Sequence, residues 1–157
     1  MAVSLFIRLL IYASIFIALV LIFLPTWLLE GSGIQRPATY GLAQVGGLII
    51  GTLGGLLALW CIATFVIIGR GTPFPFDPPR RLVVRGPYRF SRNPMLIGVT
   101  STLLGAALFY TSLTLLSYAV ILFLIVTAMI LGYEEPHLRE TFGEEYEDYC
   151  RRVRRWI

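Results

Sequence analysis

Charged and polar residues gather at two places in a chain that is otherwise largely apolar. The first is the block 86–95, in which Arg89 and Arg92 precede an Asn93-Pro94 break. The second is the adjacent pair Glu134-Glu135, which follows the last long apolar stretch. Ionisable groups near membrane helices are costly and are usually kept for a function. We therefore interpret the two groups as parts of one ligand site at the membrane surface.

The two glutamates are predicted to have different surroundings. Adjacent residues on a helix point about 100° apart, so at most one of Glu134 and Glu135 faces a given pocket. A carboxylate at the C-terminal end of a helix opposes the helix dipole. A cationic ligand group or a nearby arginine would offset this unfavourable placement. The alternative is a solvated helix end with no ligand.

Some arginines of the central loop are expected to set the membrane topology, and others to form the ligand site with the Asn-Pro break. Arg89 and Arg92 flank the polar block beside Tyr88, and they are the better candidates for the site. An Asn side chain at a helix start caps free amides or recognises a donor and acceptor edge of a ligand. Both roles stay open for Asn93. The basic residues expected mainly to set topology and contact phosphates are Arg80, Arg81 and Arg85.

Several kinds of catalytic centre are not indicated. His137 is the lone histidine, and with no second His or Cys nearby a metal site is not expected. We expect His137 to be a surface residue, with a general base as the alternative. Cys61 and Cys150 are expected at different depths, which argues against a disulfide. No serine lies in a nucleophile elbow, and no nucleotide-binding fingerprint is present.

The elements that must position these residues are apolar helices. Of the 157 residues 57% are hydrophobic and 14% charged, and the mean hydropathy is +0.77. So few charges cannot form the polar shell of a soluble domain. Four stretches, at 5–24, 40–68, 95–110 and 113–133, can be read as spans of a bilayer core of about 30 Å, although the third is short. The sequence predicts an all-α polytopic membrane protein with about four transmembrane helices.

The basic residues predict the orientation of these spans. All thirteen are arginine. With four spans, every arginine except Arg36 falls on one side of the membrane. The positive-inside rule then places both termini and the loop 69–94 in the cytoplasm. The net charge of +4 indicates attraction to a lipid bilayer with anionic headgroups rather than nucleic-acid binding.

We expect one membrane domain over residues 1–157, with two N-terminal spans in 1–68 and a Pro- and Arg-rich loop at 69–94. Residues 95–133 form a helical hairpin, because the link at 110–112 is too short for anything but a tight turn. The hairpin returns Glu134 and Glu135 to the membrane face that carries Arg92 and Asn93. Residues 134–157, the tail, form a cytoplasmic amphipathic helix, either lying at the interface or folded back as a lid.

Small residues predict close helix packing. Gly47, Gly51 and Gly55 recur at four-residue spacing, with Gly46 and Gly54 beside them, and they form a ridge that another helix can approach. Residues 98, 101, 102 and 105 make a second small-residue face in the third span.

The motifs of the second half of the chain resemble those of the isoprenylcysteine carboxyl methyltransferase and phospholipid methyltransferase family. The resemblance covers residues 69–155 and is carried by the order and spacing of many short pieces. They are Gly71-Thr-Pro73, Pro78-Pro79, Leu82-Val-Val84, Gly86-Pro-Tyr-Arg89, Arg92-Asn-Pro-Met95 with Gly98, Glu134-Glu135, Leu138, Phe142-Gly143, Tyr146, Tyr149 and Val153-Arg154.

This resemblance implies an integral-membrane enzyme that binds S-adenosylmethionine at the cytoplasmic ends of its last two spans. It assigns no catalytic residue, and the positioning candidates are Arg89, Arg92 and Glu135. Asn93 replaces a common histidine, a variant that the family also uses, and Leu96 replaces a frequent tyrosine. The cofactor-binding residues that it implies are Tyr88, Arg92, Asn93, Pro94, Met95, Gly98, Glu134 and Glu135.

The charges of these residues suit such a cofactor. Glutamates can bind its ammonium group, and an arginine can pair with its carboxylate. Methyl transfer by in-line displacement depends mainly on positioning. The acceptor stays open among an isoprenylcysteine carboxylate, a phospholipid amine and a small apolar nucleophile. Two alternatives remain, a nicotinamide-dependent reductase related to sterol reductases and a non-enzymatic membrane assembly or transport protein.

Overall fold

The computed structural model describes residues 15, 17–69 and 82–156, and every regular element in this part is a helix. The prediction of an all-α protein is therefore confirmed for the described residues. The elements are η1 (Ile17–Phe23), α2 (Leu24–Gly31), α3 (Leu42–Thr64), η2 (Phe65–Gly69), η3 (Gly86–Arg89), α4 (Pro94–Tyr110), α5 (Leu113–Met129), η4 (Ile130–Glu134), α6 (Glu135–Phe142) and α7 (Glu144–Arg152). Residues 70–81 of the Pro- and Arg-rich loop expected at 69–94 lie outside the described residues.

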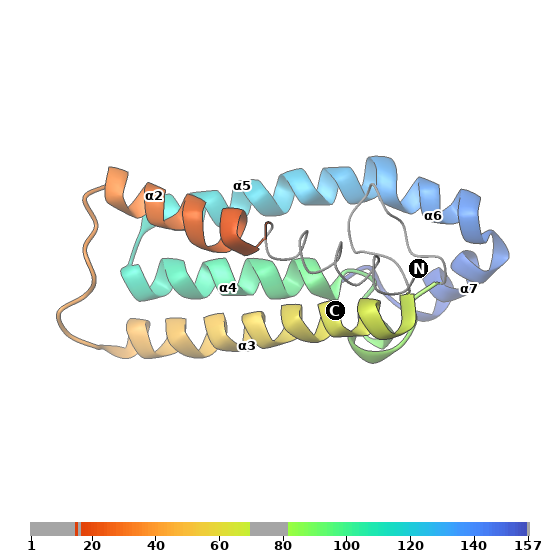
Figure 1. Ribbon diagram of the computed structural model, residues 1–157, viewed down its shortest axis with the longest axis horizontal. Coiled ribbons are helices and arrows are strands. Elements are labelled where there is room, and N and C mark those ends of the chain that lie inside the picture. The colour runs from red at the N-terminus through yellow and green to blue at the C-terminus, as the bar shows by residue number, and fades with distance from the viewer. Residues whose placement is uncertain (1–14, 16, 70–81, 157) are drawn as a thin grey trace.

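The long helices run side by side along the long axis of the molecule (Figure 1). Helices α3, α4 and α5 form the body, α2 lies beside α5 at one end, and α6 and α7 lie at the other end. Among the described residues, two helices are long and apolar enough to cross a membrane, Leu42–Thr64 and the continuous Leu113–Phe142. Ile17–Gly31 and Pro94–Tyr110 are apolar but shorter.

The first apolar helix continues beyond its predicted end at residue 24. Pro25 lies in the first turn of α2, where its missing amide hydrogen is tolerated. The Thr26 hydroxyl donates to the carbonyl oxygens of Ile22 at 2.8 Å and of Phe23 at 2.9 Å. The helix passes through the proline and ends at Gly31.

The closest contact in the body is between the backbones of α3 and α4. A Cβ atom added to Gly47 would lie 2.6 Å from both the Gly105 oxygen and the Phe109 nitrogen. A Cβ added to Gly54 would lie 2.6 Å from the Thr102 nitrogen. Only glycine at these positions lets the helices approach so closely, which confirms the prediction of a small-residue ridge.

The ridge follows a different line from the expected one. Gly54, and not Gly55, makes the close contact, since the nearest atom to a Cβ on Gly55 is 3.9 Å away. The next contact along α3 is Ala58, whose nitrogen would lie 2.8 Å from a Cβ on Gly98. The contacts along α3 are made by Gly47, Gly51, Gly54 and Ala58, at spacings of four, three and four residues. These spacings match the 3.6-residue period of an α-helix, whereas a strict four-residue spacing drifts away from α4.

A tight connection joins α4 to α5. Thr111 has a left-handed backbone with φ of 50°, and the hydroxyl of Ser112 accepts from the Leu115 amide at 3.2 Å as the N-cap of α5. Helix α5 then runs back along α4, so that η4 and α6 lie at the end of the bundle where α4 begins (Figure 1). The beginning of α4 and the Glu134-Glu135 pair therefore share one end of the molecule.

The tail is divided into two helices. Gly143, with φ of 51° and ψ of −124°, separates α6 from α7. This backbone conformation favours glycine. The single amphipathic helix expected for 134–157 is therefore interrupted, and α7 reverses toward the bundle. Tyr146 and Tyr149 are its buried residues.

The close α3–α4 contact generates a prediction for stability. Gly47→Ala places a Cβ against the α4 backbone, and we expect it to lower the free energy of unfolding by about 1–3 kcal/mol. Gly46→Ala is the matched control, because no atom lies within 4 Å of a Cβ at Gly46. Thermal unfolding in detergent compares the two variants. Equal melting temperatures would contradict the assigned contact.

Candidate functional site

A buried carboxylate held by two arginines lies at the centre of the candidate site. Glu135 is the first residue of α6 and is only 6% exposed. Arg155 donates to it through two parallel hydrogen bonds, from Nε to Oε1 at 2.9 Å and from its Nη2 to Oε2 at 2.9 Å. Arg92 approaches the same carboxylate, with Nη1 3.4 Å from Oε1. One negative charge is thus shared by two guanidinium groups.

Arg92 is fixed by two contacts of one guanidinium nitrogen, Nη1. Its side chain is 13% exposed, and Nη1 donates to the Cys150 sulfur at 2.7 Å. The buried Nε atom of Arg92 has no hydrogen-bond partner among the described residues. A buried donor without a partner costs free energy. The arrangement therefore has unused capacity to bind an anionic group.

The polar block before α4 is joined to the end of the tail through main-chain carbonyl groups. The Arg92 amide donates to the Arg154 oxygen at 2.9 Å. The Ser91 hydroxyl and the Asn93 side-chain amide both donate to the Arg155 oxygen, at 3.0 Å and 3.4 Å. These bonds hold the tail across the start of α4. Residue 155 is therefore held twice, through its side chain by Glu135 and through its main-chain oxygen by Ser91 and Asn93.

A pair of tyrosines adds a further connection. The Tyr149 hydroxyl donates to the Tyr88 carbonyl oxygen at 2.8 Å, and both residues are buried. Burial raises the pKa of Tyr149, so its phenol stays a neutral donor. Tyr88 packs in a core cluster with Cys61 and Val83, and its ring meets Phe65 edge-on at 5.2 Å. The tail is therefore attached to α3 as well as to α4.

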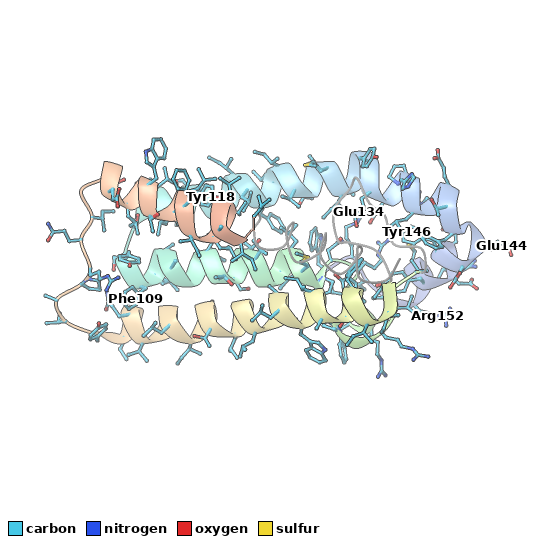
Figure 2. The ribbon with its side chains drawn as sticks, in the orientation of Figure 1. Phe109, Tyr118, Glu134, Glu144, Tyr146 and Arg152 are labelled. Atoms are coloured by element: carbon cyan, nitrogen blue, oxygen red, sulfur yellow. The ribbon has the colours of Figure 1, made fainter. Side chains whose placement is uncertain are left out.

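Glu134 differs from its neighbour. It is exposed, and it makes no ion pair or side-chain hydrogen bond with the described residues. In Figure 2 it lies on the side of its helix turned toward the rest of the bundle. Burial is the main reason that the pKa of Tyr88 is raised, and the charges of Cys61 and Glu134 add to it. Glu134 thus lies near Tyr88, and its carboxylate has no partner among the described residues.

The remaining predicted residues divide between the site and the helix packing. Asn93 precedes α4 without capping it through its side chain, and Pro94 is the first residue of α4, as predicted. Met95 packs against the Tyr88 cluster. Gly98 lies in the α3–α4 contact rather than beside Glu135. Arg89 is exposed, with its guanidinium carbon 5.9 Å from the ring centre of Phe90, so the structure does not bring it to Glu135.

The arrangement can bind a ligand that carries both charges. Arg92 and Arg155 offer guanidinium groups, and Glu134 and Glu135 offer carboxylates, all at one end of the bundle. The hydrogen bonds to Glu135 raise the pKa of Arg155, so this arginine stays charged. His137 is stacked on Tyr133 at 6.1 Å, away from this network. In the described part of the chain no three His, Cys, Asp or Glu residues gather as metal ligands.

Sequence reasoning missed the partners that come from the tail. The sequence predicts only a topology role for Arg155 and no disulfide for Cys150. Ser91 and Arg154 contribute a hydroxyl and a main-chain oxygen, which no pattern of side-chain types reveals. The charge of Glu135 was the available signal, because a buried carboxylate requires cationic partners.

A comparison with known protein families identifies the family of the chain. The sequence profile of the phospholipid methyltransferase family matches residues 42–145, more than half of the chain. This chain belongs to the phospholipid methyltransferase family. The resemblance inferred from the motifs is confirmed at this level, and membership indicates a membrane methyltransferase. No curated protein and no solved structure matched the chain.

The family match separates the two halves of the site. Tyr88, Arg92, Asn93 and the Glu134-Glu135 pair lie within the matched residues. The tail residues that hold them, at 149–155, lie beyond the match. The polar block and the glutamates therefore lie within the family match, whereas the contacts of Arg155 are seen only in the structure of this chain.

The unequal burial of the two glutamates generates a prediction. Glu135→Gln removes the charge that pairs Arg92 and Arg155, and we expect a loss of about 2 kcal/mol in the free energy of unfolding. This is less than for a fully buried pair, because Arg155 is 35% exposed. Glu134→Gln is the matched control and should leave stability nearly unchanged. Thermal unfolding at neutral pH measures both. A larger effect at Glu134 would contradict the assigned roles.

Proposed function

We propose that this protein transfers a methyl group from S-adenosylmethionine to a phospholipid amine at the membrane surface. The observation that carries the proposal is the meeting of Arg92 with Glu135, the neighbour of Glu134, in a chain of this family. Opposite charges at fixed places can orient a zwitterionic amino-acid group, which is the polar end of this cofactor. An isoprenylcysteine carboxylate and a small apolar nucleophile are the other acceptor classes.

The residues present fit the cofactor in charge and in hydrogen-bonding capacity. The unpartnered Nε of Arg92 is a buried donor suited to a carboxylate. Glu134 offers a carboxylate that has no partner among the described residues, and Glu135 a second one that is paired with arginine. Bound there, the cofactor would supply an electrophilic methyl group.

The chain itself contributes binding and orientation. Arg92, held by Cys150, would orient a ligand carboxylate. Asn93 has its side-chain amide directed to the tail through the Arg155 oxygen, so it would set the position of the tail over the site. The apolar cluster around Tyr88 would exclude water from one side. No covalent nucleophile of the protein is needed for a displacement of this kind.

The proposal includes four spans, with both termini and the loop at 69–94 in the cytoplasm. Helix α3 and the continuous helix Leu113–Phe142, which begins with α5, have the length to cross the bilayer, and the two shorter apolar helices would complete the set. The exposed large apolar side chains along α3, among them Leu53 and Leu56, support contact with lipid. An apolar acceptor would then reach the site from the bilayer, with its headgroup at the level of Arg92.

Binding of the cofactor tests the proposal directly. We expect S-adenosylmethionine to bind the purified protein in detergent, measured by calorimetry. Asn93→Ala and Glu135→Ala should weaken binding by about tenfold, since each removes a polar group that orders the site. Glu140→Ala, which alters an exposed residue of α6, is the control. Absence of binding, together with binding of a reduced nicotinamide cofactor, would favour the reductase instead.

The acceptor is tested with labelled cofactor and vesicles of defined composition. We expect label to enter phosphatidylethanolamine in vesicles that contain it, and not in vesicles of phosphatidylcholine alone. Labelled product is identified by chromatography and mass spectrometry. Label on an added prenylated cysteine and not on lipid would replace the phospholipid acceptor by the carboxylate. Cofactor binding with no label on phosphatidylethanolamine, on the prenylated cysteine or on an added small apolar nucleophile would contradict methyl transfer to all three acceptor classes.

A further inference from the structure

The Glu135 carboxylate already holds a cation supplied by the chain itself. Arg155 binds it through both oxygens, in the geometry by which a guanidinium group recognises a carboxylate ligand. Arg155 lies outside the residues matched by the family. Its role therefore has to be inferred from its contacts in this chain.

We propose that Arg155 is a resident ligand of Glu135, which the ammonium group of S-adenosylmethionine replaces when the cofactor binds. Binding would then release the end of the tail from the mouth of the site. The inference rests on the proposed function and adds to it the residue that pairs with Glu135 before the cofactor binds and the ligand group that displaces it.

The burial of the two arginines shows which one can leave. Arg92 is 13% exposed and is fixed by Cys150, whereas the Arg155 side chain is 35% exposed. Water can hydrate a released Arg155, because its charge is already partly solvated. Removing Arg92 from Glu135 would instead leave the buried guanidinium group of Arg92 without a carboxylate partner, which is much more costly. Arg155 is therefore the exchangeable partner.

The unused donor of Arg92 shows what the exchange achieves. In the present arrangement Nε of Arg92 is buried and has no partner among the described residues. A ligand with an ammonium group beside a carboxylate can replace Arg155 at Glu135 and also accept from Arg92. A guanidinium group alone satisfies only Glu135. The zwitterion therefore completes a set of contacts that Arg155 leaves incomplete.

The contacts around residue 155 provide a reporter of release. The Arg155 oxygen accepts from Ser91 and Asn93, so movement of this residue breaks main-chain contacts as well as the ion pair. The next residue, Trp156, has its ring 5.2 Å from that of Phe123 on α5. Displacing Arg155 should carry Trp156 away from Phe123.

The first test is the affinity for S-adenosylmethionine, measured by calorimetry in detergent. Arg155→Ala removes the competing cation, and we expect binding to become about fivefold tighter than in the wild type. Arg154→Ala is the matched control. It removes an equal charge from the adjacent exposed residue and keeps the main-chain oxygen that binds Arg92. A residue that only stabilises the site would give weaker binding when removed.

The second test follows Trp156 directly. The chain has three tryptophans, so Trp27→Phe with Trp60→Phe leaves Trp156 as the single fluorescent reporter. We expect saturating cofactor to shift its emission spectrum. The same protein with Arg155→Ala should show the shifted spectrum before cofactor is added. This readout does not depend on catalytic activity.

The outcomes separate this inference from the proposed function. Tighter binding by Arg155→Ala, unchanged binding by Arg154→Ala and a cofactor-dependent shift of Trp156 support the exchange. If the wild type binds and Arg155→Ala binds equally or less tightly, the exchange is wrong and the proposed function stands. An unshifted Trp156 spectrum at saturation also overturns the exchange. If neither protein binds the cofactor, both proposals fail.

Discussion

The backbone contact between α3 and α4 fixes the position of everything else in the described structure. Gly47 and Gly54 meet Gly105 and Thr102 with no room for a side-chain carbon, so the two helices have one relative register. That register places Pro94, the first residue of α4, and with it the polar block that precedes the helix. The short turn to α5 then brings Glu135 back to the same end. A site made of charges is thus positioned by residues that have almost no side chains.

Charge pairing at this end makes the tail part of the fold. A buried carboxylate is tolerated only when cationic partners surround it. Arg92 alone approaches Glu135 at 3.4 Å through one nitrogen, whereas Arg155 supplies the two shorter bonds. The tail must therefore lie across the start of α4 whenever no other cation occupies Glu135. The Tyr149 hydroxyl bond to Tyr88 and the reversal at Gly143 make that placement possible.

Much of this was predictable from the sequence, and the limits have physical causes. Hydrophobic length predicted the helices, and the short link after Tyr110 correctly brought Glu135 to Arg92. The choice of Gly54 over Gly55 depends on helix phase, which a four-residue spacing does not define. The partner Arg155 was missed because side-chain spacing carries information only within one helix, and Gly143 breaks the helix in between. Main-chain acceptors such as the Arg155 oxygen cannot be predicted from residue type, because every residue has a main-chain carbonyl group.

The placement of Glu135 between Arg92 and Arg155 also has a consequence for biosynthesis. Ribosomes make the chain from its N-terminus, and early segments begin to fold before later ones exist. The contact of α3 with α4 needs only those two helices, so it does not depend on α6 or α7. Arg92 has no carboxylate partner until Glu135 has been made, after α5. The ion pair between Glu135 and Arg155 can form only once residue 155 has been added. Assembly therefore proceeds from the glycine contact to the charges, and a translation product that stops before α7 would contain the bundle but lack a closed site.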